Sequence, residues 1–159
     1  MNRDCSQGFT LIELVVTLSI VGLLATMISP LTSVSVIRIK EQDLSRNLKE
    51  IRTAIDQYKE YAERGFIQRT PGDSGYPESL KVLVEGVTNI KDPEAKKIYF
   101  LRRMPGDPFN KNGVRSNELS WGLRAYDSEW DDPQPGDDVY DVYSTSTNVG
   151  LNGVIYREW

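Results

Sequence analysis

The side chains that carry most enzyme chemistry are scarce in this sequence. There is no histidine, which removes the usual general base near neutral pH and the commonest metal ligand. The single cysteine, Cys5, lies in the first few residues, so neither an internal disulfide nor a zinc cluster can form. Nucleophilic triads of the Ser-His or Cys-His kind are excluded, and any catalysis would depend on carboxylates, Ser/Lys or a metal ion. We therefore expect a protein that is not an enzyme.

One group of carboxylates is dense enough to be considered for a metal site. It occupies a short stretch interrupted by proline and glycine, and comprises Asp127, Glu129, Asp131, Asp132, Asp137, Asp138 and Asp141. Calcium takes several oxygen ligands, and acidic loops supply them, so the candidates are Asp131, Asp132, Asp137 and Asp138. EF-hand spacing is absent, and a solvated acidic loop is the competing interpretation. We expect no metal, and we keep calcium as the alternative.

A further carboxylate, Glu13, lies inside an apolar run from Phe9 to Leu31. The run is long enough to cross a bilayer at about 1.5 Å per residue. A charge at the centre of a span costs about 2.5 to 3.5 kcal/mol, and less near its end, so Glu13 requires a partner. A secretory signal peptide would hold Glu13 inside its apolar region, which argues against it. A plain signal anchor with an acid near the membrane surface is the simple alternative.

The run continues into an amphipathic helix after Pro30. Its apolar residues recur at alternating four- and three-residue spacing: Leu44, Leu48, Ile51, Ile55, Tyr58 and Ala62. On the polar side, Arg52/Asp56 and Glu60/Arg64 have the i, i+4 spacing of ion pairs, and Gly65 is a natural C-cap. The pattern predicts one helix from residue 9 to about residue 64, on the order of 80 Å long. Since fewer than three full heptads are present, packing on the chain's own head is favoured over a free coiled coil.

The remaining residues, 65–159, predict a small α+β head. A short helix opens at Tyr76-Pro77 and ends at Gly86, and Asp92-Pro93-Glu94 has the composition of a further helical turn. Three segments are rich in β-forming residues: 121–126, 139–145 and 154–159. The economical arrangement is a small antiparallel sheet packed against the long helix.

The N-terminal motif carries a resemblance to a known family. Gly8-Phe9-Thr10-Leu11-Ile12-Glu13, followed by the apolar helix, resembles the class III leader junction of type IV pilins and type II secretion pseudopilins. The resemblance implies that a prepilin peptidase cuts between Gly8 and Phe9 and methylates the new amine of Phe9. It also implies that Pro30 bends the anchor helix, as an interior proline does by removing a backbone donor.

The same resemblance implies a role for Glu13 in assembly. In the mature chain Glu13 lies four residues beyond the freed ammonium of Phe9. A carboxylate buried among packed apolar helices is tolerable if a neighbouring subunit supplies a cation, and the N-terminal amine is the cation nearby in the sequence. The pair would set the axial register between subunits.

The head resembles the major, G-type pseudopilin in chain order. The parallels are the Tyr76-Pro77 helix start, the Met104-Pro105-Gly106-Asp107-Pro108 turn, the Asp141-Val142-Tyr143-Ser144 strand and the terminal tryptophan. G-type pseudopilins bind calcium through aspartates in the loop after that strand. Here this loop, residues 145–153, contains no carboxylate, so the family-type calcium site is expected to be lost.

Together these observations predict a pseudopilin with four segments: a leader (1–8), a membrane-spanning and filament-core helix (9–31), its amphipathic continuation (32–64) and a periplasmic head (65–159). Expected partners are copies of itself, minor pseudopilins, the prepilin peptidase, the inner-membrane assembly platform and membrane lipid. The net charge of -4, without a basic stripe, argues against nucleic acid. The expected function is a short periplasmic filament of type II secretion, anchored in the inner membrane. The alternatives are a type IV pilin of a surface fibre and, from another class, a membrane-anchored enzyme or ligand-binding domain.

Overall fold

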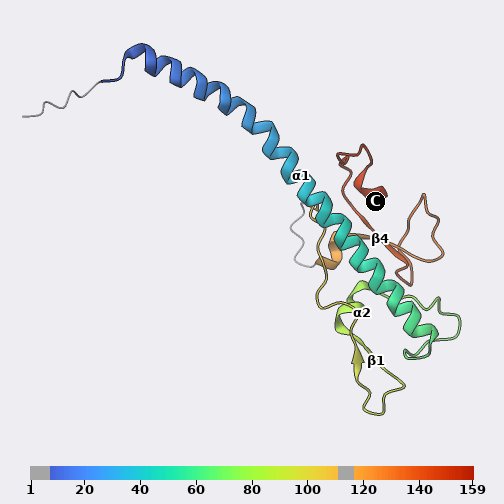
Figure 1. The fold of residues 1–159 in the computed structure, drawn as a ribbon. Coiled ribbons are helices and arrows are strands. Elements are labelled where there is room, and N and C mark those ends of the chain that lie inside the picture. The colour runs from blue at the N-terminus through green and yellow to red at the C-terminus, as the bar shows by residue number, and fades with distance from the viewer. Residues whose placement is uncertain (1–7, 111–116) are drawn as a thin grey trace, which may run out of the picture. The chain divides into compact units, whose positions relative to one another are not determined.

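The structure is a computed structural model that describes residues 8–110 and 117–159, apart from the side chains of residues 26–33, 117 and 118. It divides into two compact units, Met1–Ile39 and Lys40–Trp159. The elements in chain order are α1 (Leu11–Glu63), α2 (Leu80–Glu85), β1 (Val87–Thr88), β2 (Lys97–Ile98), the 3-10 helix η1 (Asn117–Ser120), β3 (Trp121–Arg124), β4 (Asp141–Ser144) and the 3-10 helix η2 (Tyr156–Glu158) (Figure 1). The predicted α+β class, a long N-terminal helix with an antiparallel head, is confirmed.

The long helix begins and ends close to the predicted residues. α1 covers Leu11–Glu63, against a prediction of residues 9 to about 64. Gly65 then adopts a φ of 72°, and its backbone N–H bonds the carbonyl of Ala62 at 3.1 Å. This left-handed conformation costs glycine little and satisfies a carbonyl of the last turn, so the predicted C-cap is confirmed.

The apolar stripe of α1 forms one wall of the head's core. Leu44, Ile51 and Ile55 are fully buried, and Leu48 is nearly so. Residues from every part of the head pack against them: Leu80, Leu83, Leu101, Met104, Trp121, Val139, Val142 and Tyr156. The hydrophobic effect therefore holds the second half of α1 on its own head, as the stripe predicted.

The short helix α2 starts later than predicted. Its N-cap is Ser79, and Pro77 lies before the helix because the carbonyl of Pro77 accepts the backbone N–H of Val139 at 2.8 Å. α2 ends at Gly86, as expected. The predicted helical turn at Asp92-Pro93-Glu94 is wrong: these residues connect β1 to β2, and Asp92 Oδ1 accepts the N–H of Glu94 at 2.9 Å.

The predicted sheet is split, within the described residues, into two antiparallel pairs. β1 pairs with β2, and β3 pairs with β4 in the register Trp121↔Ser144 to Arg124↔Asp141. The β-rich segment 154–159 does not form a third strand partner. After one bridge between Val149 and Ile155 it turns into η2, which buries Tyr156 against the rings of Phe109 and Trp159.

Candidate functional site: the processing junction and the head loops

The predicted cleavage point lies just before the first turn of α1. Gly8, Phe9 and Thr10 precede the helix, and the Phe9 side chain is 82% exposed. A Cβ at Gly8 would meet no atom within 4 Å. Gly8 and Phe9 are thus both exposed, as the residues of a peptidase cleavage point must be.

Glu13 has a local role that the sequence analysis missed. Its backbone N–H bonds Thr10 Oγ1 at 3.3 Å, and the first backbone bond of the helix runs from Leu14 N–H to the Thr10 carbonyl at 3.2 Å. Thr10 is therefore the N-cap, and a carboxylate at Glu13 is favoured by the positive end of the helix dipole. The signal was available, because Thr10 and Glu13 have the Thr-x-x-Glu spacing of a capping box. The pairing of Glu13 with a Phe9 amine of another subunit remains a prediction.

The first turns of α1 present apolar side chains on all sides. Exposed fractions range from 49% to 84% for Leu11, Ile12, Leu14, Val15, Val16, Leu18, Ile20, Val21, Leu23 and Leu24. Among the described residues, however, none of the helices combines the length and apolarity needed to cross a bilayer. The backbone of α1 is helical through Pro30, whose side chain lies outside the described residues, so the predicted kink remains a prediction.

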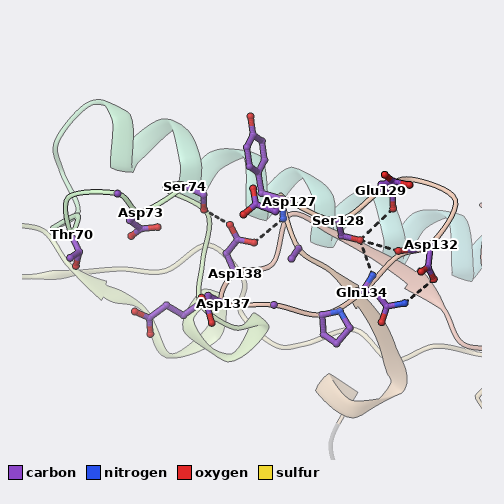
Figure 2. Close-up of a pocket in the computed structure, with 16 residues that line it drawn as sticks. Thr70, Asp73, Ser74, Asp127, Ser128, Glu129, Asp132, Gln134, Asp137 and Asp138 are labelled. Carbon is purple, nitrogen blue, oxygen red and sulfur yellow. Dashed lines mark hydrogen bonds between the residues drawn. The ribbon is translucent and has the colours of Figure 1, made fainter.

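Three of the four carboxylates proposed for calcium, Asp132, Asp137 and Asp138, line a cleft of about 920 Å³ between residues 70–78 and 125–138 (Figure 2), and Asp131 does not line it. Asp138 bonds the Tyr126 backbone N–H at 2.9 Å and the Ser74 hydroxyl, while Asp132 Oδ1 accepts from the Gln134 amide at 2.7 Å. Asp132 thus organises its own loop, and Asp138 links its loop to residues 70–78. Asp131 and Asp137 are exposed, and no group of three or more His, Cys, Asp or Glu among the described residues is arranged to hold a metal ion. Calcium binding remains a prediction.

The loop predicted to have lost a calcium site is held by a carboxylate from α1. Glu41 Oε1 accepts the backbone N–H of Leu151 at 2.6 Å and the hydroxyl of Tyr156 at 3.0 Å. Burial, and secondarily the bond to Glu41, raises the pKa of Tyr156 to about 12. We call the contact of Glu41 with Leu151 and Tyr156 the Glu41 clasp. The sequence carried no signal for it, since Glu41 and Tyr156 are 115 residues apart.

Arg52 fastens β4 and the end of the chain to α1. Its guanidinium bonds Asp141 Oδ1 at 2.7 Å, the Val142 carbonyl at 3.0 Å and the Trp159 carbonyl at 2.9 Å. The predicted Arg52–Asp56 pair is therefore wrong, because the better acceptors are on the head. The predicted pair of Glu60 and Arg64 is present at 2.7 Å.

A long N-terminal helix, preceded by a Gly-Phe junction and carrying a small α+β head on its second half, is consistent with the pilin-like fold. Residues 3–29 match the family model described as the prokaryotic N-terminal methylation motif. The chain is 26% identical over 113 residues to type II secretion system core protein G of Klebsiella michiganensis, and 29% identical over 113 residues to the protein of the same name from Pseudomonas aeruginosa. Each alignment covers 69% of this chain and 72% of the relative. No solved structure gives a significant match. The resemblance to the pseudopilins, and to their G-type subunit, is confirmed.

Proposed function

We propose that this chain is a pseudopilin precursor that a prepilin peptidase cuts between Gly8 and Phe9, and that it then polymerises into a short periplasmic filament for type II protein secretion. The observation that carries the proposal is the methylation-motif match over residues 3–29, at an exposed junction that leads directly into α1. The relatives named as secretion-system core proteins support the same role and argue against an enzyme.

The apolar surface of the first turns of α1 supports polymerisation. Side chains such as Leu11 and Ile12, at 84% and 72% exposed, have an unfavourable contact with water that a membrane or neighbouring helices would relieve. We propose that the chain resides in the inner membrane before assembly, with its head in the periplasm, as the resemblance to type II secretion pseudopilins implies. In the filament, the apolar helices of several copies would pack together, with Glu13 set against the Phe9 amine of a neighbour. Minor pseudopilins and the assembly platform would be its further partners.

The test is the mass of the mature N-terminal peptide, from the full chain expressed with and without a prepilin peptidase. We expect a peptide that begins with N-methylated Phe9 in the presence of the peptidase alone. Gly8→Val should block this product, because a β-branched side chain replaces the smallest residue at the junction. Gly22→Ala is the matched control, since a Cβ at Gly22 meets no atom within 4 Å, and it should be processed normally. An uncut chain in every case would refute the proposal.

A secretion assay separates the two kinds of filament. Deletion of a pseudopilin should block release of an exported protein and leave surface fibres intact. Loss of surface fibres with normal release would instead identify a type IV pilin.

A further inference from the structure

A groove between α1 and residues 100–103 has an apolar floor and a cationic rim. It has a volume of about 720 Å³ and is lined by Arg46, Lys49, Glu50, Thr53, Ala54 and Gln57 of α1 and by Phe100, Leu101, Arg102 and Arg103. Ala54 and Leu101 are buried, whereas Arg102 and Arg103 are exposed. We call this site the α1 groove.

The cations of the α1 groove are only partly balanced. Arg46 pairs with Asp43 at 2.7 Å, but no ion pair of Lys49, Arg102 or Arg103 is formed within the described residues. Of the side chains that the structure describes, Glu50 is the one carboxylate that lines the groove. The rim therefore keeps a net positive charge and favours an anionic partner.

The loop of residues 127–132 complements the α1 groove, because it carries an exposed aromatic side chain between two carboxylates. Trp130 is 81% exposed, and it lies between Glu129 and Asp131, which are also exposed. An indole of this kind supplies a large contact area in an apolar pocket and stacks well on guanidinium groups. Carboxylates on both sides of Trp130 would meet the arginines of such a pocket. We call residues 127–132 the Trp130 loop.

The surface around the Trp130 loop has a net negative charge, even when the nearby cations are counted. Seven carboxylates line the adjoining cleft: Asp73, Glu78, Asp127, Glu129, Asp132, Asp137 and Asp138 (Figure 2). The cations beside it, Lys59, Arg69 and Arg124, bond backbone carbonyls of Ser74, Asp73 and Ser128 respectively. Three cations cannot neutralise seven carboxylates, so this side of the head favours a cationic partner.

The two surfaces lie on opposite flanks of α1. Ala54 lines the α1 groove beside Phe100 and Leu101, whereas Arg52 contacts Asp141 on the side from which the Trp130 loop emerges. Two residues apart on an α-helix project about 160° from one another. No residue of the Trp130 loop lines the α1 groove, so the two surfaces do not meet within the described molecule. Complementary patches on opposite flanks make a heterologous contact, which builds a ring or an open filament rather than a two-fold pair.

We propose that the Trp130 loop of one copy docks in the α1 groove of the next, with Trp130 on the apolar floor and Glu129 and Asp131 against Arg102 and Arg103. This inference rests on the proposed filament function and names the head-to-head contact within it. The occupant is a second copy of this chain, because the chain itself carries both halves of the contact with matching charge and apolar area.

Site-specific crosslinking tests the contact directly. Two full-length chains with different tags, both carrying Cys5→Ser, are expressed together with a prepilin peptidase. One has Glu129→Cys and the other Arg103→Cys, and oxidation should join the two tags in one product. Lys96→Cys replaces Arg103→Cys in the control pair, since Lys96 is exposed but does not line the groove, and this pair should give about tenfold less product.

Charge reversal gives a second test of the same contact. Its readout, filament yield, does not depend on the cysteine variants. Arg102→Glu with Arg103→Glu, or Glu129→Lys with Asp131→Lys, should each lower filament yield about tenfold, because like charges then face each other. All four changes in one chain should restore the yield. Lys81→Glu, an equal type of change on the exposed side of α2, should have little effect.

The outcomes separate the inference from the proposed function. If the unaltered chain is methylated at Phe9 and forms filaments, but the tags do not join and the reversals have no effect, the docking contact is wrong and the filament function stands. Crosslinks that join a tagged chain to a different protein would also overturn docking between copies. If the unaltered chain is neither processed nor assembled, both proposals fail.

Discussion

The Glu41 clasp makes a prediction whose size follows from the geometry. Glu41 Oε1 is the acceptor for two donors, the Leu151 N–H at 2.6 Å and the Tyr156 hydroxyl at 3.0 Å. Hydrogen bonds to a charged group contribute about 1.5 to 3 kcal/mol each when they are well formed. Leu151 is exposed and can bond water instead, whereas the ring of Tyr156 is 2% exposed. We therefore expect Glu41→Ala to lower the free energy of unfolding by about 2 kcal/mol, mainly through the buried hydroxyl.

A double-mutant cycle isolates the clasp from other effects of truncation. Glu41→Ala, Tyr156→Phe and the double variant are unfolded in urea as full-length chains in detergent, followed by tryptophan fluorescence. The two changes should be non-additive by about 1 kcal/mol, because either one removes their shared bond. Glu50→Ala is the matched control on the outer side of α1, and a change within about 0.5 kcal/mol is expected for it.

Amide hydrogen exchange gives the local readout. The Leu151 amide should lose protection in Glu41→Ala, whereas amides of β3 and β4 should keep theirs relative to global unfolding. Additive effects in the cycle, together with unchanged exchange at Leu151, would refute the assignment of Glu41 as the residue that holds this loop.

Three other predictions concern the head. Since burial raises the pKa of Tyr156 from about 10 to about 12, the contribution of this group to stability should be fully present below pH 10 and be lost between pH 10 and 12, a decrease on the order of 3 kcal/mol. Tyr156→Phe, compared in the same titration, should lack that part of the decrease. Arg52→Met keeps the apolar stem but removes the hydrogen bonds to Asp141 and to two backbone carbonyls, so the free energy of unfolding in urea should fall by about 2 kcal/mol. An unchanged free energy of unfolding would contradict the role of Arg52. Gly86→Ala should destabilise by about 1 to 3 kcal/mol in thermal unfolding, because Gly86 has a φ of 74° and a Cβ would lie 2.8 Å from the Ile98 carbonyl oxygen; equal stability would show that the turn can relax.

Local patterns account for the parts of the fold that were predicted correctly. The stripe from Leu44 to Ala62 is a periodic signal within one element, so its buried face and the helix end at Gly65 could be read directly. The strands β3 and β4 follow in the same way from short β-rich segments separated by turn residues. Segment 154–159 has the same composition, but here Tyr156 is buried and stacks on Phe109 at a centroid distance of 3.9 Å. We attribute the formation of η2 in place of a strand to this aromatic contact.

Long-range polar contacts could not be predicted, because nothing in their local sequence marks them. Arg52 has Asp56 at the ideal helical spacing, yet it bonds Asp141, 89 residues away. Asp138 resembles its acidic neighbours in sequence, but it alone bonds both Ser74 and the Tyr126 backbone. By contrast, the cap formed by Thr10 and Glu13 is a local contact, and the Thr-x-x-Glu spacing of the two residues predicts it.

The contacts between α1 and the C-terminal segment also constrain when the head can fold. Glu41 and Arg52 hold residues that lie 115 and 107 positions further along the chain, and Tyr156 is part of the central core. Closing loops of that length costs conformational entropy, and only the contacts of the C-terminal residues with α1 offset that cost. During synthesis, α1 and α2 therefore emerge long before the residues that complete their core. The core of the head can therefore be completed only once Tyr156 has been synthesised, so the head folds as a whole after translation has passed η2 rather than segment by segment.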